Sequence, residues 1–126
     1  MSKLGIHSFV WSAGSSRQEI ETALTRTKEA GFDLIELSYL DPKVVDIPWL
    51  ARRLEELGLG VAISMGLPVD GDISSADQDI AENGVAILDR AVALTRDLGG
   101  TKLGGILSSA HGYSSQAPTR AAWDRS

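Results

Sequence analysis

The chain has 126 residues, of which 43% are hydrophobic and 23% are charged, as in an ordinary single globular domain. Its formal net charge is −5 and its Lys and Arg residues form no run, which excludes the basic surface of a protein that binds nucleic acid or an anionic membrane. The absence of cysteine excludes disulfides and thiolate metal sites, and it is compatible with a reducing cytoplasm, where we expect the protein to reside. No window approaches the roughly 18 apolar residues that a membrane span needs.

Short apolar segments alternate with longer helical patterns along the chain. The apolar segments predict four strands, at Leu4–Phe9, Phe32–Leu37, Val61–Met65 and Thr101–Leu107. The helical patterns predict helices from about Arg17 to Gly31, from Asp46 to Gly58, from Asp77 to Leu98, and a first turn at Thr119–Asp124. Polar segments predict long loops at Pro68–Asp79 and at residues 108–118.

Helix-start signals support these boundaries. Ser16 followed three residues later by Glu19 is a capping box. Asp46 precedes Pro48, and proline suits the first turn of a helix because its missing N–H is not needed there. Ile20, Leu24 and Thr27 recur at helical spacing and predict the buried face of the first helix.

The order of elements predicts an α/β fold with a parallel sheet and right-handed crossovers. Long loops follow three of the four strands, and in (β/α)₈ barrels the functional loops are those that follow strands. A complete barrel needs about 250 residues. We therefore predict a (β/α)₄ half of a TIM barrel whose last helix is truncated, with residues 1–126 forming a single partial domain. Such a half would leave two open sheet edges, which favour association.

Several segments, taken in order, resemble the ketose 3-epimerases (D-tagatose and D-psicose 3-epimerase) among the xylose isomerase-like TIM barrels. The similar segments are residues 5–11 (GIHSFVW), 30–38 (AGFDLIELS), 64–67 (SMGL), 73–77 (ISSAD) followed by Gly84, and Leu98-Gly99 with Gly104-Gly105. The resemblance implies a sugar or sugar phosphate as the substrate. Hydroxypyruvate isomerase, inosose dehydratase and endonuclease-IV-like proteins share the superfamily.

The resemblance also implies a mechanism. The family holds one divalent metal, usually Mn²⁺ or Co²⁺, with two Glu, an Asp and a His, and the two Glu exchange the C3 proton through a cis-enediolate. These ligands come from strands five to eight of the barrel. No residue of this chain matches them, so we expect no catalytic residue, metal ligand or cofactor within the chain itself.

The expected contribution of the chain is a wall of the sugar site. His7 stands where the family usually has an aromatic residue facing the sugar, and it either faces the site or is a strand histidine bonded inside the barrel. Phe9 and Trp11 share its face if the strand stays regular. Trp11 either closes over a sugar or fills the core. Ser15 occupies the position of the family's aromatic lid residue.

Further residues complete the predicted wall. Glu36 interrupts an apolar strand and is either a buried hydrogen-bond acceptor inside the barrel, for example for His7, or part of a salt bridge or a protonated group. Gly66 either lets the backbone approach a ligand or makes a simple turn. Ser108 and Ser109 end the fourth strand, one of them facing the mouth of the barrel. His111 replaces a common Trp of the family, or is a surface-loop histidine.

Two functions remain open at this point. In the first, the chain is the N-terminal portion of a sugar isomerase or epimerase, inactive alone, with a C-terminal half as its partner. In the second, it is a non-catalytic half-barrel that self-associates, two copies closing one eight-stranded barrel as a homo-oligomer. An independent flavodoxin-like domain is disfavoured because no glycine-rich phosphate loop follows the first strand.

Overall fold

The computed structural model describes residues 2–112, 117 and 119–126. Its strands are β1 (Gly5–His7), β2 (Leu34–Ser38), β3 (Gly60–Leu67) and β4 (Leu103–Ala110), and they form one parallel sheet in the order β1-β2-β3-β4. The helices are α1 (Arg17–Glu29), α2 (Ile47–Leu57), α3 (Gln78–Asp97) and α4 (Arg120–Arg125), and two 3₁₀ turns lie at Ser8–Val10 (η1) and Val69–Gly71 (η2). This arrangement confirms the predicted α/β half-barrel.

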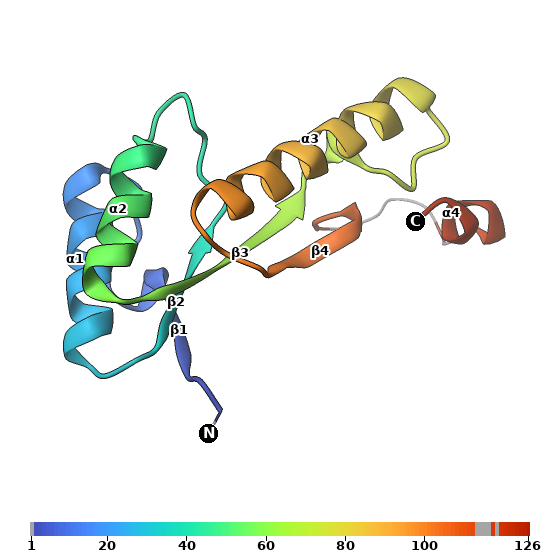
Figure 1. Cartoon of the computed structure of the whole chain (residues 1–126). Coiled ribbons are helices and arrows are strands. Elements are labelled where there is room, and N and C mark those ends of the chain that lie inside the picture. The colour runs from blue at the N-terminus through green and yellow to red at the C-terminus, as the bar shows by residue number, and fades with distance from the viewer. Residues whose placement is uncertain (1, 113–116, 118) are drawn as a thin grey trace.

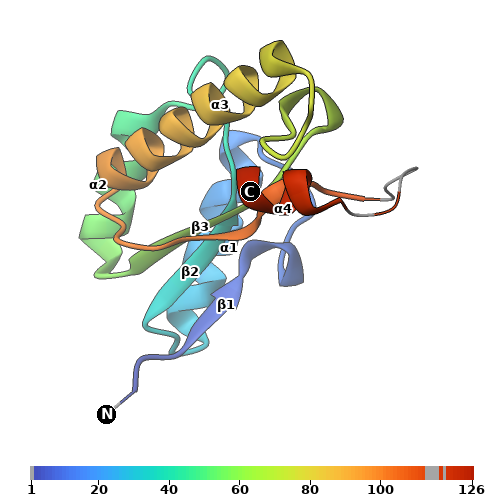
Figure 2. The same ribbon diagram turned by 90° about the vertical axis from the view of Figure 1, so that its right-hand side faces the viewer.

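Helices α1, α2 and α3 lie on the same side of the sheet, and no α-helix of the described residues covers the opposite side (Figures 1 and 2). The core lies between the sheet and these helices, and its most completely buried large side chains are Leu24, Ile35, Leu50, Ile63 and Leu67. Burial of such apolar surface is the main favourable term in folding. The uncovered side, called the open face below, is therefore where polar groups of the strands are accessible.

The predicted helix starts are confirmed by their capping contacts. Ser16 Oγ accepts a hydrogen bond from the Glu19 backbone N–H, and the Glu19 carboxylate accepts one from the Ser16 backbone N–H at 3.1 Å. The Ser16 hydroxyl and the Ser16 backbone N–H both donate to this carboxylate, and they hold the pKa of Glu19 below its ordinary value. Asp46 caps α2 through the Trp49 N–H at 3.0 Å.

The first and last strands end at residues different from those predicted. β1 stops at His7, because the His7 side chain accepts a bond from the Phe9 N–H and caps the turn η1. β4 continues through Ser108 and Ser109 to Ala110, because a bulge changes the register between Gly66 and Leu67 and so keeps its end paired to β3. Residues 113–116 and 118 of the predicted loop lie outside the described residues.

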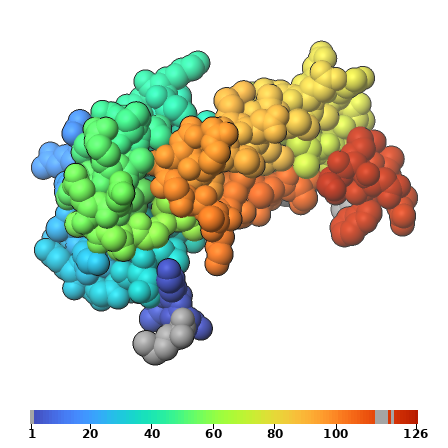
Figure 3. All heavy atoms as spheres, viewed as in Figure 1, coloured from blue at the N-terminus to red at the C-terminus, as the bar shows by residue number. Residues whose placement is uncertain are grey.

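Helix α4 stands apart from the body, next to the segment that leads into α3 (Figures 1 and 3). Arg125 connects α4 to that segment, because its Nε and a terminal guanidinium nitrogen donate hydrogen bonds to the Ser74 carbonyl at 3.2 and 3.1 Å. Trp123 on this helix is 74% exposed. In the part of the chain that the structure describes, no helix combines the length and the apolar character of a membrane span.

Candidate functional site

Successive side chains of a strand point to opposite faces of the sheet, and in β2 this alternation separates polar from apolar side chains. Ile35 and Leu37 of β2 are buried against the helices, so the intervening Glu36 and the following Ser38 belong to the open face. The register places Glu36 next to His7 and Ser38 next to Ser64. Polar groups of three neighbouring strands are thereby brought together on one side of the sheet.

His7, Glu36 and Ser38 form a cluster at the ends of β1 and β2. His7 Nε2 lies 3.4 Å from Ser38 Oγ and 3.9 Å from Glu36 Oε1. The structure thus brings together the pair that the sequence suggested. The Glu36 side chain is 43% exposed, however, which corrects the expectation of a buried carboxylate, because no described element covers the open face.

Phe9 and Trp11 do not share a strand face with His7. The regular strand assumed for them ends at His7, and the turn η1 rotates the following side chains. Phe9 is 58% exposed, with its ring edge against the His7 ring at a centroid distance of 4.6 Å. Trp11 packs against the core and donates from Nε1 to Thr27 Oγ1 at 3.0 Å, so its indole is directed toward α1.

A groove of about 710 Å³ lies next to the carboxyl ends of β2 and β3 and is also lined by residues of β4 and α3. Parallel α/β barrels bind ligands at the carboxyl ends of their strands. Of the predicted residues, Gly66 and His111 line it; His7 lies one strand to its side, next to Ser38. The residues that line the groove are Ser38, Tyr39, Ser64, Met65, Gly66, Pro68, Ile87, Arg90, Gly105, Ile106 and His111. A second, mainly apolar groove of about 390 Å³ lies on the helix side, between the start of α2 and α3.

Ser38 and Ser64 are site candidates that were not singled out from the sequence. The sequence nevertheless carried a signal, because each is a hydroxyl residue that directly follows a buried aliphatic residue, Leu37 or Ile63, in an apolar strand. The alternation assigned their side chains to the face opposite the core. Only the pairing of β2 with β3 shows that the two hydroxyl residues are neighbours.

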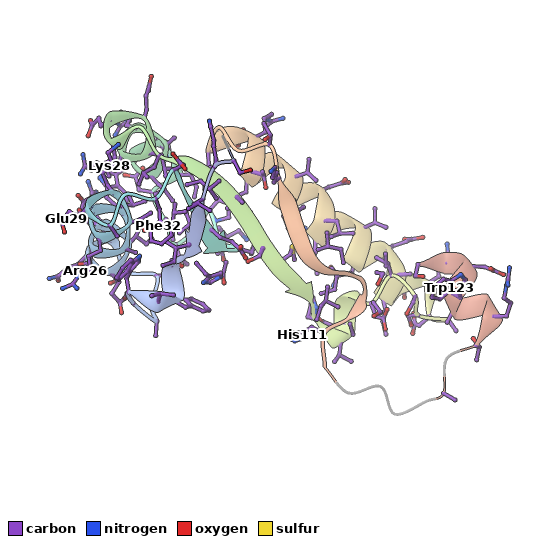
Figure 4. All side chains as sticks on the ribbon, turned by 90° about the horizontal axis from the view of Figure 1, so that it is seen from below. Arg26, Lys28, Glu29, Phe32, His111 and Trp123 are labelled. Atoms are coloured by element: carbon purple, nitrogen blue, oxygen red, sulfur yellow. The ribbon has the colours of Figure 1, made fainter. Side chains whose placement is uncertain are left out.

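Gly66 is in close contact with His111. A Cβ atom added at Gly66 would lie 2.6 Å from the His111 Cβ, so no side chain larger than hydrogen fits there without movement. His111 is held in place by its backbone N–H, which donates to the Leu67 carbonyl at 2.7 Å. Figure 4 shows His111 at the tip of β3 and β4. The absent side chain at Gly66 therefore lets His111 form one wall of the groove.

Ser108 and Ser109 belong to β4 but do not line the groove. Ser108 is exposed and Ser109 is half-buried. Both stand in the bulged part of the strand, between the paired residues Ile106 and Ala110. Their predicted role toward a substrate stays a prediction.

Asp72 connects the loop after β3 to the end of β4. Burial disfavours its carboxylate, but hydrogen bonds from the Ser74 side chain and backbone and from the Ala110 backbone, with the charge of Arg125, keep its pKa below the ordinary value. Its Oδ1 accepts from the Ser74 N–H at 2.8 Å. This carboxylate therefore fixes the rim of the groove, rather than lining it.

The described residues do not form a metal site. Within residues 2–112, 117 and 119–126, no three His, Asp or Glu side chains gather closely enough to hold a metal ion. His7 and Glu36 make only a pair. This donor set does not fit the four-ligand metal site that the resemblance implies.

Comparisons with known proteins give a consistent result. No model of a known protein family matches the chain. It is 64% identical to L-ribulose 3-epimerase of Mesorhizobium japonicum over 126 residues, covering 100% of this chain and 42% of the relative. It is 36% identical to a ketose 3-epimerase of Arthrobacter globiformis over 108 residues, covering 86% of this chain and 37% of that protein.

Solved structures agree with the sequence matches. A structure of L-ribulose 3-epimerase superimposes with a TM-score of 0.95 at 62% identity, over 99% of this chain and 42% of the other. The Methylomonas sp. D-allulose 3-epimerase in complex with D-allulose superimposes with a TM-score of 0.92 at 30% identity, over 98% of this chain and 43% of the other. The chain thus spans about two fifths of the length of the relatives it matches.

Proposed function

We propose that this chain, which is a homologue of the ketose 3-epimerases and corresponds to their N-terminal part, supplies a sugar-binding wall for ketose 3-epimerisation. The observation that carries this proposal is the groove next to the carboxyl ends of β2 and β3, where Ser38, Ser64 and His111 come together. The relative whose structure holds D-allulose supports a ketose as the ligand class.

The groove has the chemistry that a sugar requires. The hydroxyls of Ser38 and Ser64 both donate and accept hydrogen bonds, as sugar hydroxyls do. Met65 and Ile106 provide apolar surface for the C–H side of a sugar ring or chain. Polar groups that are few and convergent, set in apolar walls, fix the orientation of a small ligand.

Binding, rather than proton transfer, is the role that we assign to these residues. Epimerisation at C3 removes a proton from one face of that carbon and returns it to the other, which requires acid–base groups on both faces. The described lining of the groove includes no Asp or Glu. We therefore propose that the proton-transferring groups and the divalent metal (Mn²⁺ or Co²⁺ in the family) belong to the part of such enzymes beyond the aligned region.

A chimera tests this proposal. Residues 1–126 replace the aligned region of the Mesorhizobium japonicum L-ribulose 3-epimerase, and conversion of L-ribulose is measured with Mn²⁺ present. We expect epimerase activity in the chimera, and a several-fold higher KM after Ser64→Val, which removes a groove hydroxyl. Val44→Ala serves as the control, because Val44 is 77% exposed and lies outside the groove.

Two results would contradict this proposal. A chimera that is monodisperse, with the circular dichroism of the parent enzyme, but neither converts nor binds L-ribulose would rule out this function. Equal KM values for the Ser64→Val and Val44→Ala variants would rule out the groove as the binding wall.

A second candidate function, self-association, is favoured by the sheet edges. β1 and β4 are the outer strands of the described sheet, and Leu4 and Ile106 beside them are 65% and 43% exposed. Unpaired parallel edges template pairing with another chain. Two copies closing an eight-stranded barrel would sediment as a dimer at micromolar concentration, and a strict monomer would contradict this candidate.

A further inference from the structure

The ring of His7 has different partners at its two nitrogens. Nδ1 accepts a hydrogen bond from the Phe9 backbone N–H at 3.1 Å. A backbone N–H can only donate, so Nδ1 carries no proton in this arrangement. In the neutral ring the proton is then on Nε2.

The protonated nitrogen is directed toward the neighbouring strand. Nε2 lies 3.4 Å from Ser38 Oγ and 3.9 Å from Glu36 Oε1, both on the open face. Neither distance is that of a short, strong hydrogen bond, so the Nε2–H retains capacity to donate to a further oxygen. Ser38 also lines the groove, which makes the cluster continuous with it.

The surroundings of His7 restrain the ring in one orientation. The Phe9 ring packs edge-on against it, with an interplanar angle of 61°. Glu36 is the one charged group that the described contacts place at Nε2. A carboxylate next to the N–H of a histidine favours the tautomer that carries this proton, and it also fixes the orientation of the ring.

We propose that His7 is a tautomer-fixed hydrogen-bond donor at the edge of the sugar groove, and that Glu36 and Ser38 are positioning residues which act through it. The Phe9 N–H selects the tautomer, and Glu36 and Ser38 aim Nε2–H at a ligand oxygen. This inference rests on the proposed function for the identity of the ligand, a ketose hydroxyl. The tautomer itself depends only on the contacts of His7.

Nitrogen-15 NMR of the chain tests the tautomer. At pH 8, long-range ring correlations are expected to show a single Nε2–H tautomer for His7, together with a through-bond coupling between its Nδ1 and the Phe9 amide. His111, the only other histidine of the sequence, provides the internal reference. A proton on Nδ1 of His7, or tautomer averaging equal to that of His111, would overturn the inference.

Two substitutions separate the roles of the two ring nitrogens. His7→Asn retains an acceptor near the Nδ1 position, and thus the turn η1, but lacks the distal donor. His7→Gln retains a distal donor but lacks the proximal acceptor. In the chimera we expect His7→Asn to raise the KM for L-ribulose about two- to tenfold, the size of one hydrogen bond, with kcat nearly unchanged.

A double-mutant cycle tests the positioning role of Glu36. If Glu36 acts through His7, Glu36→Gln raises KM in the chimera but adds nothing further in the His7→Asn background. Additive effects, or an unchanged KM in Glu36→Gln, would contradict the positioning role. An inactive chimera would contradict the proposed function alone, since the NMR spectrum still decides the tautomer.

Discussion

Replacing Gly66 with alanine tests the geometry of the groove directly. The new Cβ would lie 2.6 Å from Cβ of His111 and 2.9 Å from its Cγ and Nδ1, far inside ordinary contact distance. His111 cannot withdraw freely, because its backbone N–H is bonded to the Leu67 carbonyl at 2.7 Å. Overpacking of this kind costs about 1–3 kcal/mol of unfolding free energy.

Gly104 supplies a matched control on the adjacent strand. It pairs with Ser64 on β3, and a Cβ added there meets no atom within 4 Å. Gly104→Ala should be neutral or stabilise the chain by about 0.4–1 kcal/mol, because alanine restricts the unfolded state. Urea unfolding of both variants, followed by circular dichroism, is expected to separate their midpoints clearly.

The contact with His111 can be isolated further. In the double variant Gly66→Ala/His111→Gly, the Cβ atom of residue 111 that collides with the new Cβ at position 66 is absent. This variant should recover much of the stability lost in Gly66→Ala, less the cost of the new glycine at position 111. Equal unfolding midpoints for Gly66→Ala and Gly104→Ala would refute the reasoning. So would an unmoved His111 NMR signal in Gly66→Ala.

Two further predictions concern the scaffold. Leu24 is fully buried, so Leu24→Ala should cost about 2–5 kcal/mol of unfolding free energy, measured by urea denaturation; a cost below about 1 kcal/mol would contradict the described core. For Asp72 the folded pKa is below its ordinary value of 3.8, so its contribution to stability is present above that value and disappears as the pH falls through the lower folded pKa. Asp72→Asn should therefore flatten the decline of thermal stability below about pH 4, and an unchanged acid profile would contradict the assigned hydrogen bonds.

The order of elements and most helix ends can be read from the sequence alone. Ser16 and Asp46 each cap the helix that they predicted, because capping requires only groups a few residues apart. The buried stripe of α1 was equally visible, since Ile20 and Leu24 recur at the helical period. Helix caps and helical periodicity depend on residues that are only a few positions apart, so both can be predicted from the sequence.

Which side chains meet at the site depends instead on contacts between segments that are distant in the sequence. The end of β1 at His7 depends on a side-chain cap that no strand pattern reveals, and it moved Phe9 and Trp11 off the expected face. The pairing of Ser38 with Ser64, and the contact of Gly66 with His111, depend on the register and the bulge between neighbouring strands. Residues far apart in sequence become neighbours through hydrogen bonding and packing across the sheet. The composition of a single strand cannot specify these interactions, which is why the wall of the groove emerged only from the folded chain.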